Sequence, residues 1–286
     1  MRSLPIALAG SALLIASPLA AQEGVDWGGL IAGIAHGTAM DEVAQESVSS
    51  NRRSATRATP APSAKLTYTP SIERRRANFA RFVEKSRAKD SEGAALLEKE
   101  LATVDLIDKM APILAEYGMR IDNVGHAYAT WWLNAWLAAH RRTDTPPAAQ
   151  IVAIRDQAVR AMASLPEITT ADDAAKQEMA ETYLLQAALI GAHLEHAKDD
   201  PTALDRIATA VREGARSSGL DLDAMALTDS GFVPGQAAPT ATTAAEVQKG
   251  AGSNTLLYVV GAAAIAGLLG GIWFGRRRRS GARRPG

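Results

Sequence analysis

The sequence contains no cysteine among its 286 residues. This absence excludes disulfide bonds, thiolate metal sites, a cysteine nucleophile and lipid attachment to an N-terminal cysteine. It says nothing about the redox compartment, because a helical domain of this size can bury enough surface without cross-links. Aromatic residues are also scarce, at 5% of the chain, so a local concentration of them is informative.

The chain also lacks an excess of charge of either sign, since 31 bases balance 31 acids. The balance is an average over unlike segments. Residues 1–21 contribute one base and residues 256–286 contribute six arginines, whereas the segment between them has a net charge of −7. An acidic central segment argues against nucleic acid as a partner, because phosphate contacts need clustered Lys and Arg.

Residues 1–21 have the pattern of a secretory signal peptide. Arg2 precedes an apolar run over residues 4–16, and small residues precede the polar pair Gln22 and Glu23. A charged start, a short apolar stretch and small residues at its exit are typical of cleaved export signals. We therefore expect an exported chain whose mature part begins near residue 22.

Residues 255–275 predict a transmembrane helix. Residues 256–275 contain no charged side chain, and 20 residues at about 1.5 Å each span roughly the 30 Å hydrocarbon layer. Trp273 lies near one end, where aromatic rings favour the membrane interface. Four arginines follow at once: Arg276, Arg277, Arg278 and Arg279. Because positive charge is retained in the cytoplasm, we expect residues 276–286 to form a basic cytoplasmic tail.

The two ends predict one topology. It is that of a single-pass protein of the inner (cytoplasmic) membrane, which contacts membrane lipid through its C-terminal span and holds its N-terminal domain in the periplasm or another extracytoplasmic space. C-terminal sorting signals have a similar layout and are cut, but no Leu-Pro-x-Thr-Gly-like sequence precedes residue 256.

Small residues recur every four positions within the predicted span. They are Ala263, Gly267, Gly271 and Gly275. Such a face lets two helix backbones approach closely, so a homodimer through the span is one expectation. The alternative is that glycine and alanine are simply common in membrane helices.

Composition divides the exported part into three segments. Residues 22–65 predict a weakly helical N-terminal segment that passes, over residues 47–63, into a disordered linker of Ser, Thr, Ala and Pro. Residues 233–254 predict a second flexible linker. Residues 66–232 remain as the folded domain.

The pattern over residues 66–232 predicts an all-α fold, a compact bundle of six or seven helices. Apolar residues recur at helical spacing, and no alternating β-branched run or hairpin dipeptide is present. The expected helices lie near residues 70–89, 92–102, 104–117, 123–141, 146–164, 171–198 and 201–218. Pro112 should kink or shorten the third of them.

Helix termini are predicted from capping residues. Three capping side chains precede prolines, in the pairs Thr69-Pro70, Thr145-Pro146 and Asp200-Pro201. Further N-cap candidates are Ser91, Thr103, Asp122 and Thr170. Gly118 and Gly219 stand where left-handed helix ends would fall.

Several segments resemble an uncharacterised family of exported bacterial proteins, a domain of unknown function. They are LTYTPS (66–71), RRR (74–76), YGMRIDNV (117–124), AYATWW (127–132), GLDLDAM (219–225) and GF (231–232). The resemblance covers about residues 66–232 and implies a compact helical domain in the bacterial envelope. It implies no activity and no catalytic residues.

Histidines supply the weak candidates for catalysis and for metal binding. His193 and His196 lie three residues apart, which places them on neighbouring turns of a helix. With a carboxylate they could hold a zinc ion. However, the end of a helix suits exposed histidines, so a surface or capping role is the simpler interpretation and we expect no cofactor. Together with His126, they are also the candidates for a general base.

Aromatic residues concentrate in one predicted helix. Tyr128, Trp132 and Trp136 fall at four-residue steps on one face, and Trp131 points about 100° away from them. One aromatic face is needed for the core. The second face, which carries Trp131, could line a groove that stacks a sugar ring, a peptide or a partner side chain. Both interpretations, core and ligand or partner groove, remain open at this point.

Two functional hypotheses follow. The first is a non-enzymatic binding or scaffold module, anchored by one span, whose partner is an envelope protein or another envelope component. The alternative is a hydrolase that acts on envelope material and uses His126, His193 or His196 as general base. A pocket that holds one of these histidines beside a carboxylate would favour the hydrolase.

Overall fold

The computed structural model of the chain describes residues 38–51, 63–88 and 90–235. The predicted signal peptide, the predicted span and its small-residue face, and the basic tail all lie outside the described residues. Within the described residues, no helix is both long enough and apolar enough to cross a membrane.

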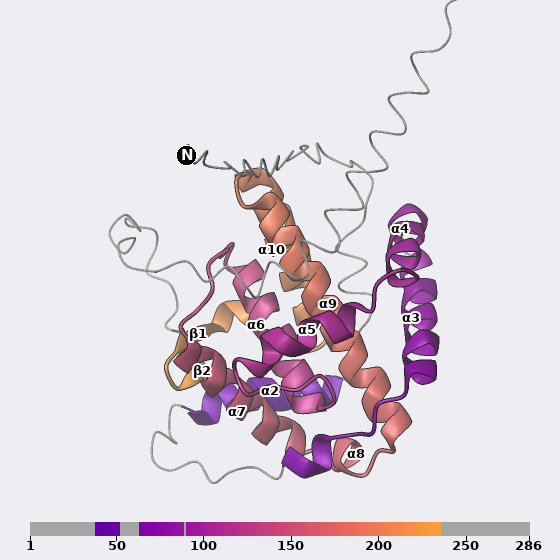
Figure 1. Ribbon diagram of the computed structural model, residues 1–286. Coiled ribbons are helices and arrows are strands. Elements are labelled where there is room, and N and C mark those ends of the chain that lie inside the picture. The colour runs from indigo at the N-terminus through magenta and orange to yellow at the C-terminus, as the bar shows by residue number, and fades with distance from the viewer. Residues whose placement is uncertain (1–37, 52–62, 89, 236–286) are drawn as a thin grey trace, which may run out of the picture.

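The described part of the chain is mostly helical, as the sequence predicts (Figure 1). Its elements are α2 (Thr38–Asn51), the 3-10 turn η1 (Ser63–Leu66), α3 (Ile72–Arg87), α4 (Ser91–Leu101), α5 (Leu106–Ala115), α6 (Val124–Ala139), α7 (Ala148–Ala163), α8 (Pro166–Thr169), α9 (Asp173–Ala197), α10 (Pro201–Ser217), the 3-10 turn η2 (Leu222–Ala224), β1 (Met225–Thr228) and β2 (Gly231–Pro234). Each of the seven predicted helices is present, with ends within two residues of the expected ones. α5, which contains Pro112, is shorter than its predicted range.

Helix α6 forms the centre of the bundle. It packs against α7, α9 and α10, and every one of its residues except Asn134 is buried. A helix that is apolar on all sides must be enclosed by other elements. In Figure 1, α3 and α4 lie side by side along one edge of the molecule, away from this centre.

The start of α6 is fixed by a cap and by a close approach. The Asn123 side chain accepts a hydrogen bond from the His126 backbone N–H at 3.1 Å, which satisfies one of the free donors of the first turn. A Cβ atom at Gly125 would lie 3.0 Å from both the Val159 Cα and the Leu66 Cδ1. Glycine at this position therefore lets α6 approach the backbone of α7.

Helix α2 corrects the expectation for the N-terminal segment. The sequence predicts little helix before residue 47 and a linker over residues 47–63, but residues 47–51 are the last turn of α2, so the linker prediction is wrong there. Met40, Ala44 and Val48, at four-residue steps, are buried where α2 packs on α7 and β2. Tertiary packing of this face supplies the stability that a short helix of weak propensity lacks alone.

The β-hairpin is a second feature that the sequence pattern did not predict. β1 and β2 pair antiparallel with Thr228 opposite Gly231, and Gly231 has a φ of 94°. The side chain of Gln157 on α7 accepts from the Phe232 N–H at 2.8 Å and donates to the Phe232 carbonyl at 3.0 Å. The Gln157 amide therefore bonds to the Phe232 backbone N–H and C=O on the outer edge of β2, as a neighbouring strand would. Val233 and Pro234 therefore belong to a strand and not to the predicted linker.

Replacing Gly125 with alanine should destabilise the domain by about 1–3 kcal/mol, because the added methyl group would push α6 away from α7. Urea denaturation of the purified chain measures this loss. The matched control is Gly235→Ala, whose Cβ would meet its nearest neighbours at an ordinary 3.4 Å and should change little. Since alanine has the higher helix propensity, a stabilised Gly125→Ala variant would contradict the close approach.

Candidate functional site

A buried ionic network joins α3 to α9. Glu181 is fully buried and Arg75 is 7% exposed. The Arg75 Nε donates to Glu181 Oε1 at 2.9 Å, and Gln177 Nε2 donates to the same oxygen at 2.9 Å. Asn78 Nδ2 donates to the other carboxylate oxygen at 2.5 Å. The carboxylate thus has a charged partner and two neutral donors, which is what a buried charge requires.

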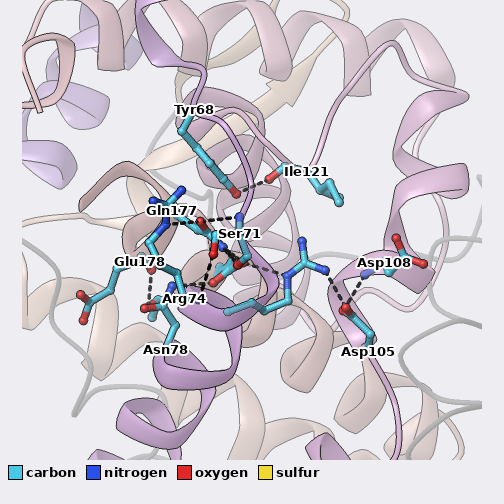
Figure 2. Close-up of polar contacts among 12 residues, drawn as sticks. Tyr68, Ser71, Arg74, Asn78, Asp105, Asp108, Ile121, Gln177 and Glu178 are labelled. Atoms are coloured by element: carbon cyan, nitrogen blue, oxygen red, sulfur yellow. Dashed lines mark hydrogen bonds and ion pairs between the residues drawn. The ribbon is translucent and has the colours of Figure 1, made fainter. Parts of the chain in front are cut away.

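The amide of Gln177 extends this network to the start of α3. Its Oε1 accepts from the Ser71 N–H at 3.1 Å and from Arg74 Nε at 2.9 Å. Its Nε2 donates to the Ser71 carbonyl at 2.7 Å. Figure 2 shows Ser71, Arg74, Asn78 and Gln177 facing one another in this region. The network therefore fixes where α3 begins relative to α9.

Arg75 also links the network to α5. Its Nη1 lies 2.6 Å from Asp105 Oδ2, while Asp105 Oδ1 caps α5 by accepting from the Asp108 N–H at 3.0 Å (Figure 2). Burial alone would lower the pKa of Arg75, but the hydrogen bonds and charges of Glu181 and Asp105 outweigh it and raise that pKa. Because its charges and polar groups are paired with one another, the arrangement is that of a network that specifies the packing of three helices.

The predicted aromatic set lies in the core. Tyr128 and Trp132 are fully buried, Trp131 is 7% exposed and Trp136 is 6% exposed. The Tyr128 ring lies 5.3 Å from Trp131 and 5.1 Å, edge to face, from Tyr183 of α9. A ligand or partner groove at these residues stays a prediction, and it would require a covering element to move. Tyr183 was not among the residues that the spacing singled out.

Trp136 connects α6 to the hairpin and to the surface. Its Nε1 donates to the Met225 carbonyl at 3.1 Å. The His140 ring stacks on it with centroids 4.2 Å apart, and the Arg142 guanidinium lies 5.4 Å from its ring. His140 is half-buried, and this burial lowers its pKa. Trp136 thus holds the end of α6 against β1.

The candidate histidines lie on two different helices. His126 is near the start of α6, and its Nδ1 accepts from the Arg120 backbone N–H at 3.0 Å. Burial, together with the positive charges of Arg155 and Arg120, lowers the pKa of His126 to about 4. Since a general base works best with a pKa near the working pH, His126 is poorly suited to that role.

His193 and His196 lie in the last turns of α9, as the sequence predicts. Burial and the neighbouring His196 lower the pKa of His193 to about 4, whereas His196 is exposed. Within the part of the chain that the structure describes, no three Asp, Glu or His side chains gather in a way that could hold a metal ion. Metal binding by this histidine pair stays the weaker of the two interpretations that the sequence offers.

Helix α2 carries a buried carboxyl group that the sequence did not single out. Asp41 is 3% exposed, and its Oδ1 accepts from the Tyr128 hydroxyl at 2.6 Å. Burial raises the pKa of Asp41 to about 6, against the opposing effect of hydrogen bonds from Ser218 and Tyr128. No sequence motif marks this residue. Its placement in a core-forming helix is what reveals it.

The chain belongs to a family of unknown function, DUF6683, which matches residues 38–234. This agrees with the resemblance to a domain of unknown function, and the match extends that resemblance to include α2 and all of β2. No curated protein and no solved structure matches the chain.

Truncating Glu181 should be strongly destabilising, because it leaves the Arg75 guanidinium buried without its main partner. We expect Glu181→Ala to lower the free energy of unfolding by about 3–5 kcal/mol, and an Arg75→Met, Glu181→Leu double variant to recover much of that loss. Urea denaturation measures both.

The matched control for this prediction joins the same two helices. Arg81 of α3 and Glu178 of α9 pair at 3.0 Å, but their side chains are 50% and 38% exposed. Arg81→Ala should therefore cost less than about 1 kcal/mol. Equal losses from Glu181→Ala and Arg81→Ala would mean that burial does not make the Arg75–Glu181 pair special.

Proposed function

We propose that this chain is a membrane-anchored, extracytoplasmic binding or scaffold module of the bacterial cell envelope. The observation that carries the proposal is the uncharged segment 256–275, followed directly by Arg276, Arg277, Arg278 and Arg279. The length of the segment, Trp273 near one end and the arginine cluster together favour one span with a cytoplasmic C-terminus. The pattern of an export signal over residues 1–21 favours the same orientation.

The chemistry of the described domain supports binding over catalysis. In its buried network, Arg75 and Glu181 are satisfied by each other and by neighbouring amides, which suits packing. His126 and His193 both have pKa values near 4, so both are neutral and weakly basic near neutral pH. The hydrolase alternative therefore rests on the third candidate, His196, which is exposed in the last turn of α9.

The proposed topology is tested with single cysteines, because the native chain has none to interfere. Ser253→Cys, before the proposed span, should react with a membrane-impermeant maleimide in intact cells whose outer barrier has been permeabilised. Ser280→Cys, after the arginines, should react only once the inner membrane is lysed. This asymmetry is expected because the positive residues hold the tail in the cytoplasm.

Two outcomes would count against the membrane anchor. One is labelling of both cysteines before lysis. The other is recovery of the full chain in the soluble fraction after cell breakage at low salt. A chain truncated after residue 255 is the control, and it should leave the membrane fraction while remaining exported.

The binding role is tested separately by crosslinking in native membranes. We expect adducts to an envelope component from the full chain and none from a control that keeps the signal, the linker and the span but lacks residues 38–234. The reason is that recognition requires the folded domain and the anchor supplies only location. Identical adduct patterns from the two chains would assign the interaction to the anchor and refute a binding domain.

A further inference from the structure

Helix α2 is held by residues that are distant in the sequence. Asn51 Nδ2 donates to the carbonyls of Ser230 and Phe232 at 2.7 and 3.0 Å, and Gln157 Nε2 donates to Ser47 Oγ at 3.2 Å. At the other end, Met40 Sδ accepts a hydrogen bond at 3.6 Å from the Tyr183 hydroxyl. A 14-residue helix with such attachments is marginal alone, so its structure depends on remaining docked.

The Asp41 carboxyl is a buried acidic group on this docked face. It lies in the first turn of α2, where the helix dipole favours negative charge. The Tyr128 hydroxyl on α6 donates a hydrogen bond to it, and the Ser218 hydroxyl at the end of α10 is a second neighbour that lowers its pKa. Both partners are neutral. Burying an ionised carboxylate without a cation is costly, because hydroxyl groups replace only part of its hydration.

Among the described residues, no cation contributes to the pKa shift of Asp41. Tyr128 of α6 and Tyr183 of α9 are the titratable groups whose own ionisation responds to Asp41, while β2 contains none. Helix α2 itself carries two further acids, Glu42 and Glu46, and α7, which packs against it, carries Arg155, Asp156 and Arg160. Charged residues elsewhere include Glu181 of α9, Arg212, Glu213 and Arg216 of α10, and Asp221 and Asp223 at η2. None of these charges is among the causes that shift the Asp41 pKa, which are burial, Ser218 and Tyr128.

We propose that α2 is an acid-strengthened latch, which docks more tightly over Tyr128 and Tyr183 when Asp41 is protonated and loosens when Asp41 ionises. Release of α2 would uncover aromatic rings of α6 and α9 without breaking the packing between those two helices. The latch operates within the folded domain and does not depend on the membrane anchor. Evidence against the latch would therefore leave the proposed membrane location intact, and evidence against that location would leave the latch intact.

The direction and the size of the pH effect on α2 docking follow from proton linkage. The Asp41 pKa is raised from 3.8 to about 6 in the docked state. Docking is therefore strongest below pH 3.8, weakens as the pH rises between these values, and changes little above pH 6. With these pKa values, the docking equilibrium should weaken about tenfold between pH 5 and pH 7.5.

The test uses a thiol probe on the buried face of α2. Val48 is 1% exposed, so in the full chain Val48→Cys reacts with a maleimide only when α2 leaves its site. Dividing its rate by that of the isolated α2 peptide with the same cysteine removes the intrinsic pH dependence of the thiol. This protection should fall about tenfold from pH 5 to pH 7.5, and in an Asp41→Asn background it should stay constant.

The matched control is Val211→Cys on α10, an identical substitution at another residue that is 1% exposed. It should label far more slowly than Val48→Cys at both pH values, because it reports opening of the rest of the domain. Equal rates at the two sites, or an unchanged pH dependence in the Asp41→Asn background, would overturn the latch.

A second variant, Tyr128→Phe, tests whether Asp41 controls the docking of α2 if Asp41→Asn fails to fold. The Tyr128 hydroxyl lowers the Asp41 pKa by donating to the ionised carboxylate. Tyr128→Phe should therefore shift the midpoint of the Val48→Cys labelling profile to higher pH. A midpoint that does not move, or moves to lower pH, would show that Asp41 does not control the docking of α2.

Discussion

The fold depends on one constraint, which is that α6 must be covered on every side. Its sequence, VGHAYATWWLNAWLAA, contains no Asp, Glu, Lys or Arg, and its aromatic rings point in more than one direction. Exposing any face of it would leave large apolar surface in water. Helices α7, α9 and α10 cover most of it, and the hairpin contacts it through Trp136 and Phe232. Helix α2 completes the cover through the bond from Tyr128 to Asp41.

Polar groups then select one arrangement of this cover. Apolar packing alone tolerates several rotations of one helix against another, whereas a buried charge tolerates few. Glu181 has donors from Arg75, Asn78 and Gln177, so α3 can sit on α9 in only one register. Gln157 does the same for β2 on α7. Glu181 is thus bonded to a cation and two amides, in contrast to the Asp41 carboxyl, whose partners are neutral hydroxyls.

That contrast bears on what the domain can do. Buried charges that are paired with one another, such as Arg75 and Glu181, suit packing better than catalysis. Docking of α2 is coupled to pH through Asp41, because the pKa of this carboxyl is raised in the docked state. If the domain lies outside the cytoplasmic membrane, as we propose, its surroundings can change pH more than the cytoplasm does. A ligand or partner groove at Trp131, one of the two interpretations that the sequence left open, would then require such a rearranged state.

The sequence by itself determined the helices and most of their ends, because helical periodicity, proline and left-handed glycine act locally. Asp200 caps α10 as predicted, and Gly118 and Gly219 have positive φ. Other caps fell one or two residues away, on Ser71, Asp90, Asp105, Asn123 and Asp172, because neighbouring polar residues compete for the same backbone donors. Only the tertiary structure decided that residues 38–51 are a core helix, that residues 225–234 pair as a hairpin, and that Asp41, Arg75 and Glu181 are buried. Each of these rests on contacts between residues far apart in the chain, such as Asn51 with Phe232 or Arg75 with Glu181, and a local pattern carries no information about such contacts.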